Sequence, residues 1–124
     1  MALGHNTTGV FDCRWVTIRP SSSRCVWTSS LREDLECPIA HGEGRFSGSE
    51  DTLRVREERD AVAFRYVGTN PNGSIGNIAG ICDSSGLVLG LMPHPENHVL
   101  ARQHPKATRR IRTGLGLELF RAGA

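Results

Sequence analysis

Alternating apolar and polar residues predict that several segments of the chain are β-strands. Residues 11–19 place Phe, Cys, Trp and Thr in alternation with Asp, Arg, Val and Ile. This period of two is typical of a strand. Residues 61–67 show the same pattern, with Phe64 and Tyr66 on one face, and residues 36–40 form a shorter candidate. The pattern therefore predicts a sheet.

Two dense apolar runs occupy residues 78–82 and 87–92, and Asp83-Ser-Ser-Gly86 separates them. Short runs joined by a four-residue turn predict an antiparallel hairpin. Because both runs are almost wholly apolar, we expect both faces of the hairpin to be covered. Residues 92–96 are expected to be extended, since a residue before proline is displaced from the α region.

Helical patterns are fewer. Ser47 and Glu50 have the spacing of a capping box, and a charged helix over residues 50–59 follows, which we expect to lie on the surface. A second helix is predicted over residues 115–121. Strands outnumber helices, which indicates an α/β or α+β fold in a single domain over residues 1–124.

Composition and charge exclude several classes of protein. With 38% hydrophobic and 23% charged residues, the chain is neither disordered nor a coiled coil. No apolar run is long enough for a membrane span, and no signal peptide follows Met1, so we expect a cytoplasmic protein without membrane contact. The basic residues Lys106, Arg109, Arg110 and Arg112 could bind nucleic acid, but no aromatic residue among them supplies stacking. We therefore expect no nucleic-acid partner.

The four cysteines are Cys13, Cys25, Cys37 and Cys82. No two of them form the C-x-x-C pair of a zinc ribbon or a thioredoxin motif. In a cytoplasmic protein we expect free thiols, each buried as a small apolar group.

The segment Met92-Pro-His-Pro-Glu96 carries the most informative chemistry. In an extended chain, residues two apart point to the same side, so His94 and Glu96 are predicted to project together. An imidazole oriented by a carboxylate is suited to general base catalysis. The three residues His-Pro-Glu are a weak motif by themselves, and on these residues alone a loop histidine beside a solvated glutamate is the better interpretation.

A second candidate is the loop that begins at His41. It contains a carboxylate between two glycines, which allow close approach of the backbone to a ligand, although local hydrogen bonds explain the same residues. The residues in question are His41, Gly42, Glu43, Gly44 and Arg45.

A metal site made by His94, His98, His104 and Glu96 is a further alternative. His94 and His98 have the spacing of two ligands on a helix. Pro95 and the expected extended backbone do not fit a shared helical face. We therefore predict no metal site.

Five motifs in order resemble the glutaminase subunit family of phosphoribosylformylglycinamidine synthase, within the class I glutamine amidotransferases. The resemblance extends over essentially the whole chain, and the ordered series is far more specific than any one match. The motifs are His41-Gly-Glu-Gly-Arg-Phe46, Phe64-Arg-Tyr-Val67, Asn70-Pro-Asn-Gly-Ser74, Ile78-Ala-Gly-Ile81 and Gly90-Leu-Met-Pro-His-Pro-Glu96.

The resemblance implies a division of roles. His94 would be the base and Glu96 its orienting carboxylate in a Cys-His-Glu triad, and the His41–Arg45 loop would border the glutamine pocket or the synthetase interface. The family's nucleophile elbow, G-I-C-N-G-F-Q, has no equivalent here, so this chain resembles only the second half of the domain. Gly80-Ile-Cys-Asp83 is similar to the elbow, but a turn into a further strand follows Cys82 where an elbow needs a helix.

The resemblance also implies the fold and the partners. We expect the C-terminal portion of a flavodoxin-like α/β domain, with a mixed sheet that includes an antiparallel hairpin. The substrate would be L-glutamine, and ammonia would pass to a synthetase subunit that holds ATP and Mg²⁺ in purine biosynthesis. This chain would hold no cofactor or metal and would be inactive without a missing N-terminal half. A non-catalytic module that binds the synthetase is the alternative.

Overall fold

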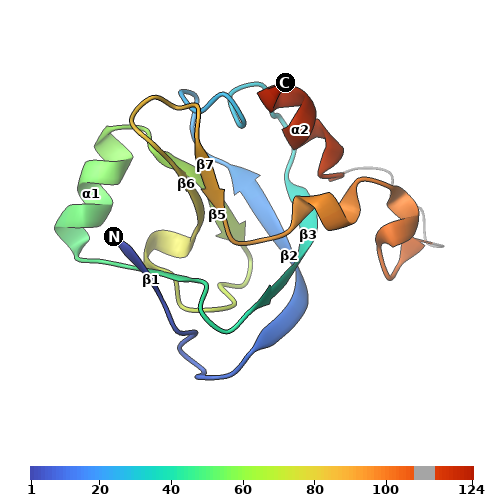
Figure 1. The fold of residues 1–124 in the computed structure, drawn as a ribbon, viewed down its shortest axis with the longest axis horizontal. Coiled ribbons are helices and arrows are strands. Elements are labelled where there is room, and N and C mark those ends of the chain that lie inside the picture. Colours follow the sequence, from blue (N-terminus) through green and yellow to red (C-terminus); the bar gives the residue numbers. More distant parts are fainter. Residues whose placement is uncertain (108–113) are drawn as a thin grey trace.

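The computed structural model describes residues 1–107 and 114–124, and its main feature is a curled five-stranded sheet (Figure 1). The strands lie in the order β3-β2-β5-β6-β7, and each described pairing is antiparallel. Their bounds are β2 Asp12–Pro20, β3 Leu35–His41, β5 Val62–Val67, β6 Ile78–Cys82 and β7 Leu89–Leu91. The expected α/β class and the antiparallel hairpin are confirmed, whereas the described strand pairings are all antiparallel and do not form the expected mixed sheet.

A second, two-stranded sheet was not predicted from the sequence. It pairs β1 (Ala2–Gly4) with β4 (Arg45–Ser47) in antiparallel register. Each strand is only three residues long, which is too short to show a period of two. The pairing exists because the two segments meet in space, and it brings the first residues of the chain to the end of the His41–Arg45 loop.

Among the described residues, the α-helices are α1 (Glu50–Glu58) and α2 (Leu117–Gly123), which lie at left and at upper right in Figure 1. No residue of α1 is buried, so its predicted surface position is confirmed. The predicted cap was wrong: Ser47 lies in β4, and it is Ser49 that accepts a hydrogen bond from the Thr52 amide at 3.2 Å. The described residues also include the 3₁₀ turns η1 Ile75–Asn77, η2 Pro95–His98 and η3 Ala101–Gln103.

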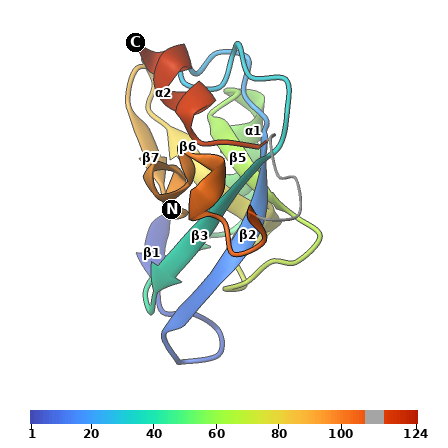
Figure 2. The ribbon, with the colours of Figure 1, turned by 90° about the vertical axis from the view of Figure 1, so that its right-hand side faces the viewer.

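The main core lies where α2 packs against the sheet (Figure 2). Ile18, Ile39 and Phe64 come from three different strands and are fully buried there, and Leu119 of α2 is almost fully buried with them. A smaller cluster joins Phe46 of β4 to residues from α1, β5 and β6. Burial of this apolar area is what holds the short strands together.

The hairpin has the predicted topology but less cover than predicted. Strand β6 is buried, whereas β7 contains only three residues and lies at the edge of the sheet. Leu87 and Val88 precede β7 and are 65% and 63% exposed. The expectation that both faces of this hairpin are covered was therefore wrong for its second strand. In the part of the chain that the structure describes, no helix has the length and apolarity needed to cross a bilayer.

Candidate functional site

His94 and Glu96 form a direct hydrogen bond. Nδ1 of His94 lies 2.8 Å from Oε1 of Glu96, and the two side chains are 39% and 56% exposed. A carboxylate only accepts hydrogen bonds, so Nδ1 carries the proton and Nε2 presents its lone pair outward. An imidazole held in this tautomer with an accessible Nε2 has the arrangement required of a general base.

The backbone around this pair differs from the expected extended chain. His94 is non-helical, with φ −108° and ψ 78°, but Pro95–His98 is the 3₁₀ turn η2, so the prediction for Glu96 was wrong. The turn, and not the two-residue repeat of a strand, brings the two side chains together. The His94 amide donates to the Pro38 carbonyl of β3 at 2.8 Å, which fixes the histidine against the sheet.

Helix α2 supports the same turn from the other side. The Gly116 amide donates to the His98 carbonyl at 2.8 Å. A Cβ at Gly116 would lie 2.1 Å from the Pro95 carbonyl oxygen, so only glycine permits this contact. The sheet and α2 thus hold both sides of the segment that carries His94 and Glu96.

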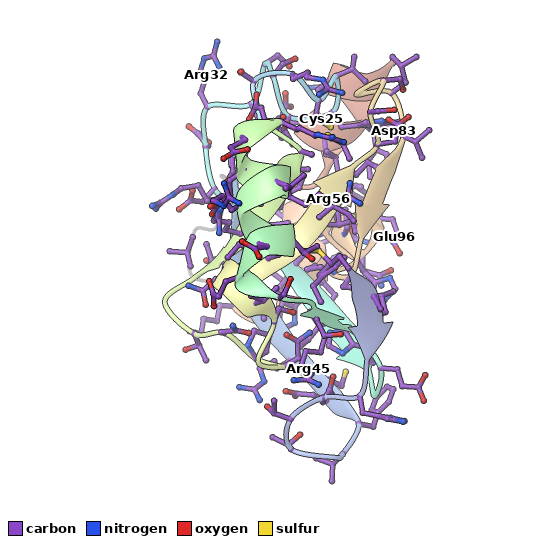
Figure 3. All side chains as sticks on the ribbon, turned by 90° about the vertical axis from the view of Figure 1, so that its left-hand side faces the viewer. Cys25, Arg32, Arg45, Arg56, Asp83 and Glu96 are labelled. Carbon is purple, nitrogen blue, oxygen red and sulfur yellow. The ribbon has the colours of Figure 1, made fainter. Side chains whose placement is uncertain are left out.

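A shallow groove of about 290 Å³ borders the pair. Its walls are mainly apolar and come from segments far apart in the sequence. They comprise Trp27, Leu89, Leu91, Pro93, His94, Pro95, Glu96, Leu119 and Phe120. In Figure 3, Glu96 lies beside the β6–β7 hairpin, at the end opposite to Asp83 in the hairpin turn.

Two of the buried cysteines, Cys37 and Cys82, are poorly suited to attack a substrate. Burial, and secondarily the charges of Glu96 and Glu36, raise the pKa of the Cys37 thiol to about 12, so it stays protonated near neutral pH. Burial also raises the pKa of Cys82, which ends β6 and leads through a turn into β7. All four cysteines are free, as expected, but Cys13 is exposed, so the prediction that all four are buried was wrong.

The His41–Arg45 loop is held by two asparagines. Asn6 donates to the His41 carbonyl at 2.8 Å, and Nδ1 of His41 donates to Oδ1 of Asn6 at 3.0 Å. Asn72 donates to the Gly44 carbonyl at 2.8 Å. The His41 ring lies directly over Gly44, where a Cβ would come within 2.6 Å of it.

Two buried nitrogens in this loop have no hydrogen-bond partner among the described residues, namely Nε2 of His41 and Nε of Arg45. Burial lowers the pKa of His41. Glu43 extends outward and pairs with His5 at 3.3 Å, and both side chains are well exposed. None of the loop residues is among those that line the groove beside His94.

The histidines of the alternative metal site are separated into two groups. His98 and His104 pack around Trp15, with ring centroids 5.0 Å and 4.3 Å from the indole, whereas His94 pairs with Glu96. Nε2 of His104 lies 3.0 Å from Oε2 of Glu36, and Nδ1 of His98 donates to the Glu36 carbonyl at 2.6 Å. Within residues 1–107 and 114–124, no three His, Cys, Asp or Glu side chains are grouped as metal ligands.

Of the basic residues considered for nucleic-acid binding, only Lys106 lies among the described residues, and it is exposed. Arg109, Arg110 and Arg112 lie outside them. The absence of a nucleic-acid partner therefore stays a prediction.

Sequence reasoning missed residues that the structure brings to these sites. Trp27 and Phe120 line the groove, and Asn6 and Asn72 hold the loop. The spacing of Asn70-Pro-Asn-Gly73 indicates a turn, but it does not show that Asn72 is fully buried against Gly44. Nothing in the sequence links these residues, because their contacts span tens of positions.

Comparison with known proteins gives a consistent result over the whole chain. The family model of the CobB/CobQ-like glutamine amidotransferase domain matches residues 1–124. The phosphoribosylformylglycinamidine synthase subunit PurQ of Treponema denticola is 43% identical over 98% of this chain and 50% of its own length. The PurQ subunit of Trichormus variabilis is 50% identical over 77% of this chain and 43% of its own length.

A solved structure gives the same result for the fold. A chain in the structure of PurLQS from Thermotoga maritima matches with a TM-score of 0.75 and 33% sequence identity, over 98% of this chain and 50% of that one. The chain thus spans about half the length of the curated relatives it matches.

Proposed function

Because this chain belongs to the CobB/CobQ-like glutamine amidotransferase family, we propose that it supplies the base and the orienting carboxylate for glutamine hydrolysis. The observation that carries the proposal is the 2.8 Å hydrogen bond from His94 to Glu96, which leaves Nε2 of His94 accessible beside an apolar groove. The names of the relatives support phosphoribosylformylglycinamidine synthase as the enzyme and purine biosynthesis as its pathway. Residues 1–124 would then be one partial domain, in the cytoplasm.

The nucleophile comes from elsewhere in this proposal, since burial raises the thiol pKa of Cys37 and Cys82 and no cysteine is among the residues that line the groove beside His94. Nε2 of His94 accepts the proton of a cysteine thiol, and the thiolate forms a C–S bond to the side-chain carbonyl carbon of L-glutamine. The C–N bond then breaks, and the His94 imidazolium returns the proton to the departing ammonia. Water hydrolyses the thioester, which releases glutamate and restores the thiol. Glu96 stabilises the imidazolium throughout.

The partner we propose is the synthetase subunit, which would receive the ammonia and hold ATP and Mg²⁺. The His41–Arg45 loop fits a contact with that subunit better than a wall of the glutamine pocket. Glu43 and His5 are exposed, and the loop does not line the groove at His94. The buried unpartnered nitrogens of His41 and Arg45 would gain partners in such a contact.

The alternative of a non-catalytic binding module is not favoured. A module of that kind does not require an ordered His–Glu pair with an accessible nitrogen. The test is to combine this chain with the half of the T. denticola relative that it does not match, and to measure release of glutamate from glutamine. We expect turnover from the mixture, none from this chain alone, and turnover at least about 10²-fold slower from a mixture that carries His94→Ala. Equal turnover with His94→Ala would contradict the proposal.

A further inference from the structure

Strand β3, at the edge of the sheet, holds both ends of the segment that carries Glu96. At one end, the Pro38 carbonyl accepts a hydrogen bond from the His94 amide at 2.8 Å. At the other end, the Glu36 carbonyl accepts one from Nδ1 of His98 at 2.6 Å. Figures 1 and 2 show the turn η2, in orange, alongside β3. Glu96 thus lies two residues from each of two points that are fixed to the same strand.

The two fixed points differ in kind, because one is a backbone amide and the other is a side chain. His98 is completely buried, whereas His94 and Glu96 are partly exposed. The ring of His98 packs against Trp15, with the ring centroids 5.0 Å apart and the planes at 88°. Its carbonyl accepts a hydrogen bond from the Gly116 amide at 2.8 Å. A close-packed ring has little room to move, so His98 fixes the end of η2.

The other ring nitrogen of His98 is not placed to take part in the reaction. Nε2 is buried and has no hydrogen-bond partner within residues 1–107 and 114–124. His98 is also not among the residues that line the groove beside His94. A buried nitrogen without a partner costs free energy, which an apolar side chain at this position would avoid. The hydrogen bond at Nδ1 is therefore what a histidine contributes here.

We propose that His98 is a positioning residue, whose hydrogen bond to the Glu36 carbonyl holds η2 so that the Glu96 carboxylate stays on Nδ1 of His94. The exposed His94–Glu96 pair has little packing of its own, and an exposed ion pair alone is weakly held. Displacement of a catalytic group by about 1 Å can cost ~10²-fold in rate. The effect on turnover rests on the proposed function, whereas the effect on the pair is a property of this chain alone.

Three variants separate positioning from packing. His98→Leu keeps an apolar side chain of similar size but removes the donor to the Glu36 carbonyl. His98→Asn restores a donor, because its amide N–H lies where Nδ1 of the histidine was. His104→Leu is the matched control: His104 is also buried against Trp15, but it lies outside η2 and contacts only the side chain of Glu36.

The first measurement is the tautomer of His94 in the full chain by itself, followed by NMR of the ring nitrogens in mildly alkaline buffer. A carboxylate at Nδ1 holds the proton there, and a ring released from Glu96 exchanges between its two tautomers. We expect the wild type, His98→Asn and His104→Leu to keep the proton on Nδ1. We expect His98→Leu to show a mixture of both tautomers in an otherwise folded spectrum.

The second measurement is glutaminase turnover in the mixture with the half of the T. denticola relative that this chain does not match. We expect His98→Leu to lower kcat about tenfold and to leave KM within about twofold, since it disturbs a catalytic group rather than the substrate site. In a Glu96→Gln background, we expect the same change to lower kcat by less than about twofold. A merely structural role would give equal losses in both backgrounds.

Three outcomes would overturn the inference: a fixed His94 tautomer in folded His98→Leu, full turnover by that variant, or equal losses in the two backgrounds. If His98→Leu does not fold, His98→Asn decides, because a folded His98→Asn chain with mixed tautomers would contradict the role of the donor. If the tautomers respond as expected but the wild-type mixture does not hydrolyse glutamine, the proposed function fails and the positioning of Glu96 by His98 is supported.

Discussion

Two of the histidine–glutamate pairs in the molecule have nearly the same length and very different surroundings. His94 and Glu96 lie 2.8 Å apart at the mouth of an apolar groove, and both are partly exposed. His104 and Glu36 lie 3.0 Å apart, and the His104 side chain is only 7% exposed beneath Trp15. The same two residue types therefore occur once in a position to react and once in a position to pack.

The two pairs differ in whether the second ring nitrogen of the histidine has a hydrogen-bond partner. In His104, Nδ1 accepts a hydrogen bond from the Lys106 amide at 3.0 Å, so both ring nitrogens are engaged. In His94, Nδ1 is engaged by Glu96, and Nε2 remains available to a proton donor from outside. A short distance to a carboxylate is thus not sufficient for catalysis, because a base also needs a free and accessible lone pair.

The largest expected effect is on turnover in the complex with the cysteine-bearing half. His94→Ala removes the base and should lower the glutaminase kcat by about 10²–10⁴-fold. His104→Ala should leave kcat within about twofold of the wild-type value, since its ring does not reach the groove. Steady-state glutamate release measures both. Equal losses in the two variants would show that the two pairs do not differ in function.

Replacing the carboxylate of each pair by an amide should give a smaller effect on the same reaction. Glu96→Gln keeps the size of the side chain but no longer stabilises the imidazolium, and we expect kcat to fall by about 10²-fold. This is less than the ~10⁴-fold drop known for a buried orienting carboxylate, because Glu96 is half exposed. Glu36→Gln is the matched control, with kcat unchanged. A full-rate Glu96→Gln enzyme would remove Glu96 from the proposed triad.

The free energy of unfolding should show the reverse order of effects from kcat, with His104→Ala changing it more than His94→Ala does. His104→Ala leaves Glu36 without its partner and opens space beneath Trp15, which should lower the free energy of unfolding by about 1–3 kcal/mol. His94→Ala changes a partly exposed side chain and should stay within about 0.5 kcal/mol of wild type. Urea unfolding followed by tryptophan fluorescence measures both. If His94→Ala destabilised the protein more, its role would be structural.

The smallest effect concerns His41, whose side-chain partner is the Asn6 amide rather than a carboxylate. Burial lowers its pKa below the ordinary value of 6.5, so the unfolded chain binds a proton more readily than the folded one. Stability should therefore be fully present above about pH 6.5 and decline as the pH falls below it. His41→Gln should reduce this slope in urea midpoints taken across pH 5–8. An unchanged slope with His41→Gln would place its origin elsewhere.

Local pattern predicted much of the fold. The strands at residues 11–19 and 61–67, the charged helix after residue 50 and the β6–β7 hairpin were all found close to their expected bounds. Their signals are periodicity and turn chemistry, which act over a few residues and are therefore readable in the sequence. The ordered motifs likewise indicated the family that the comparisons support.

Contacts between distant segments required the tertiary structure. The sequence placed His94 and Glu96 on one side of an extended chain, whereas a 3₁₀ turn fixed between β3 and α2 brings them together. Asn72 holds Gly44 from 28 positions away. Cys13 is exposed because it lies on the face of β2 opposite to the buried Val16 and Ile18.

By itself, the sequence determined which residues carry the chemistry and which short segments form strands and helices, because these depend on side-chain type and near neighbours. Only the tertiary structure decided which imidazole keeps an accessible nitrogen, which thiols are protonated by burial, and which side chain holds the turn that carries Glu96. Each of these depends on the solvent and the partner groups that long-range packing removes or supplies.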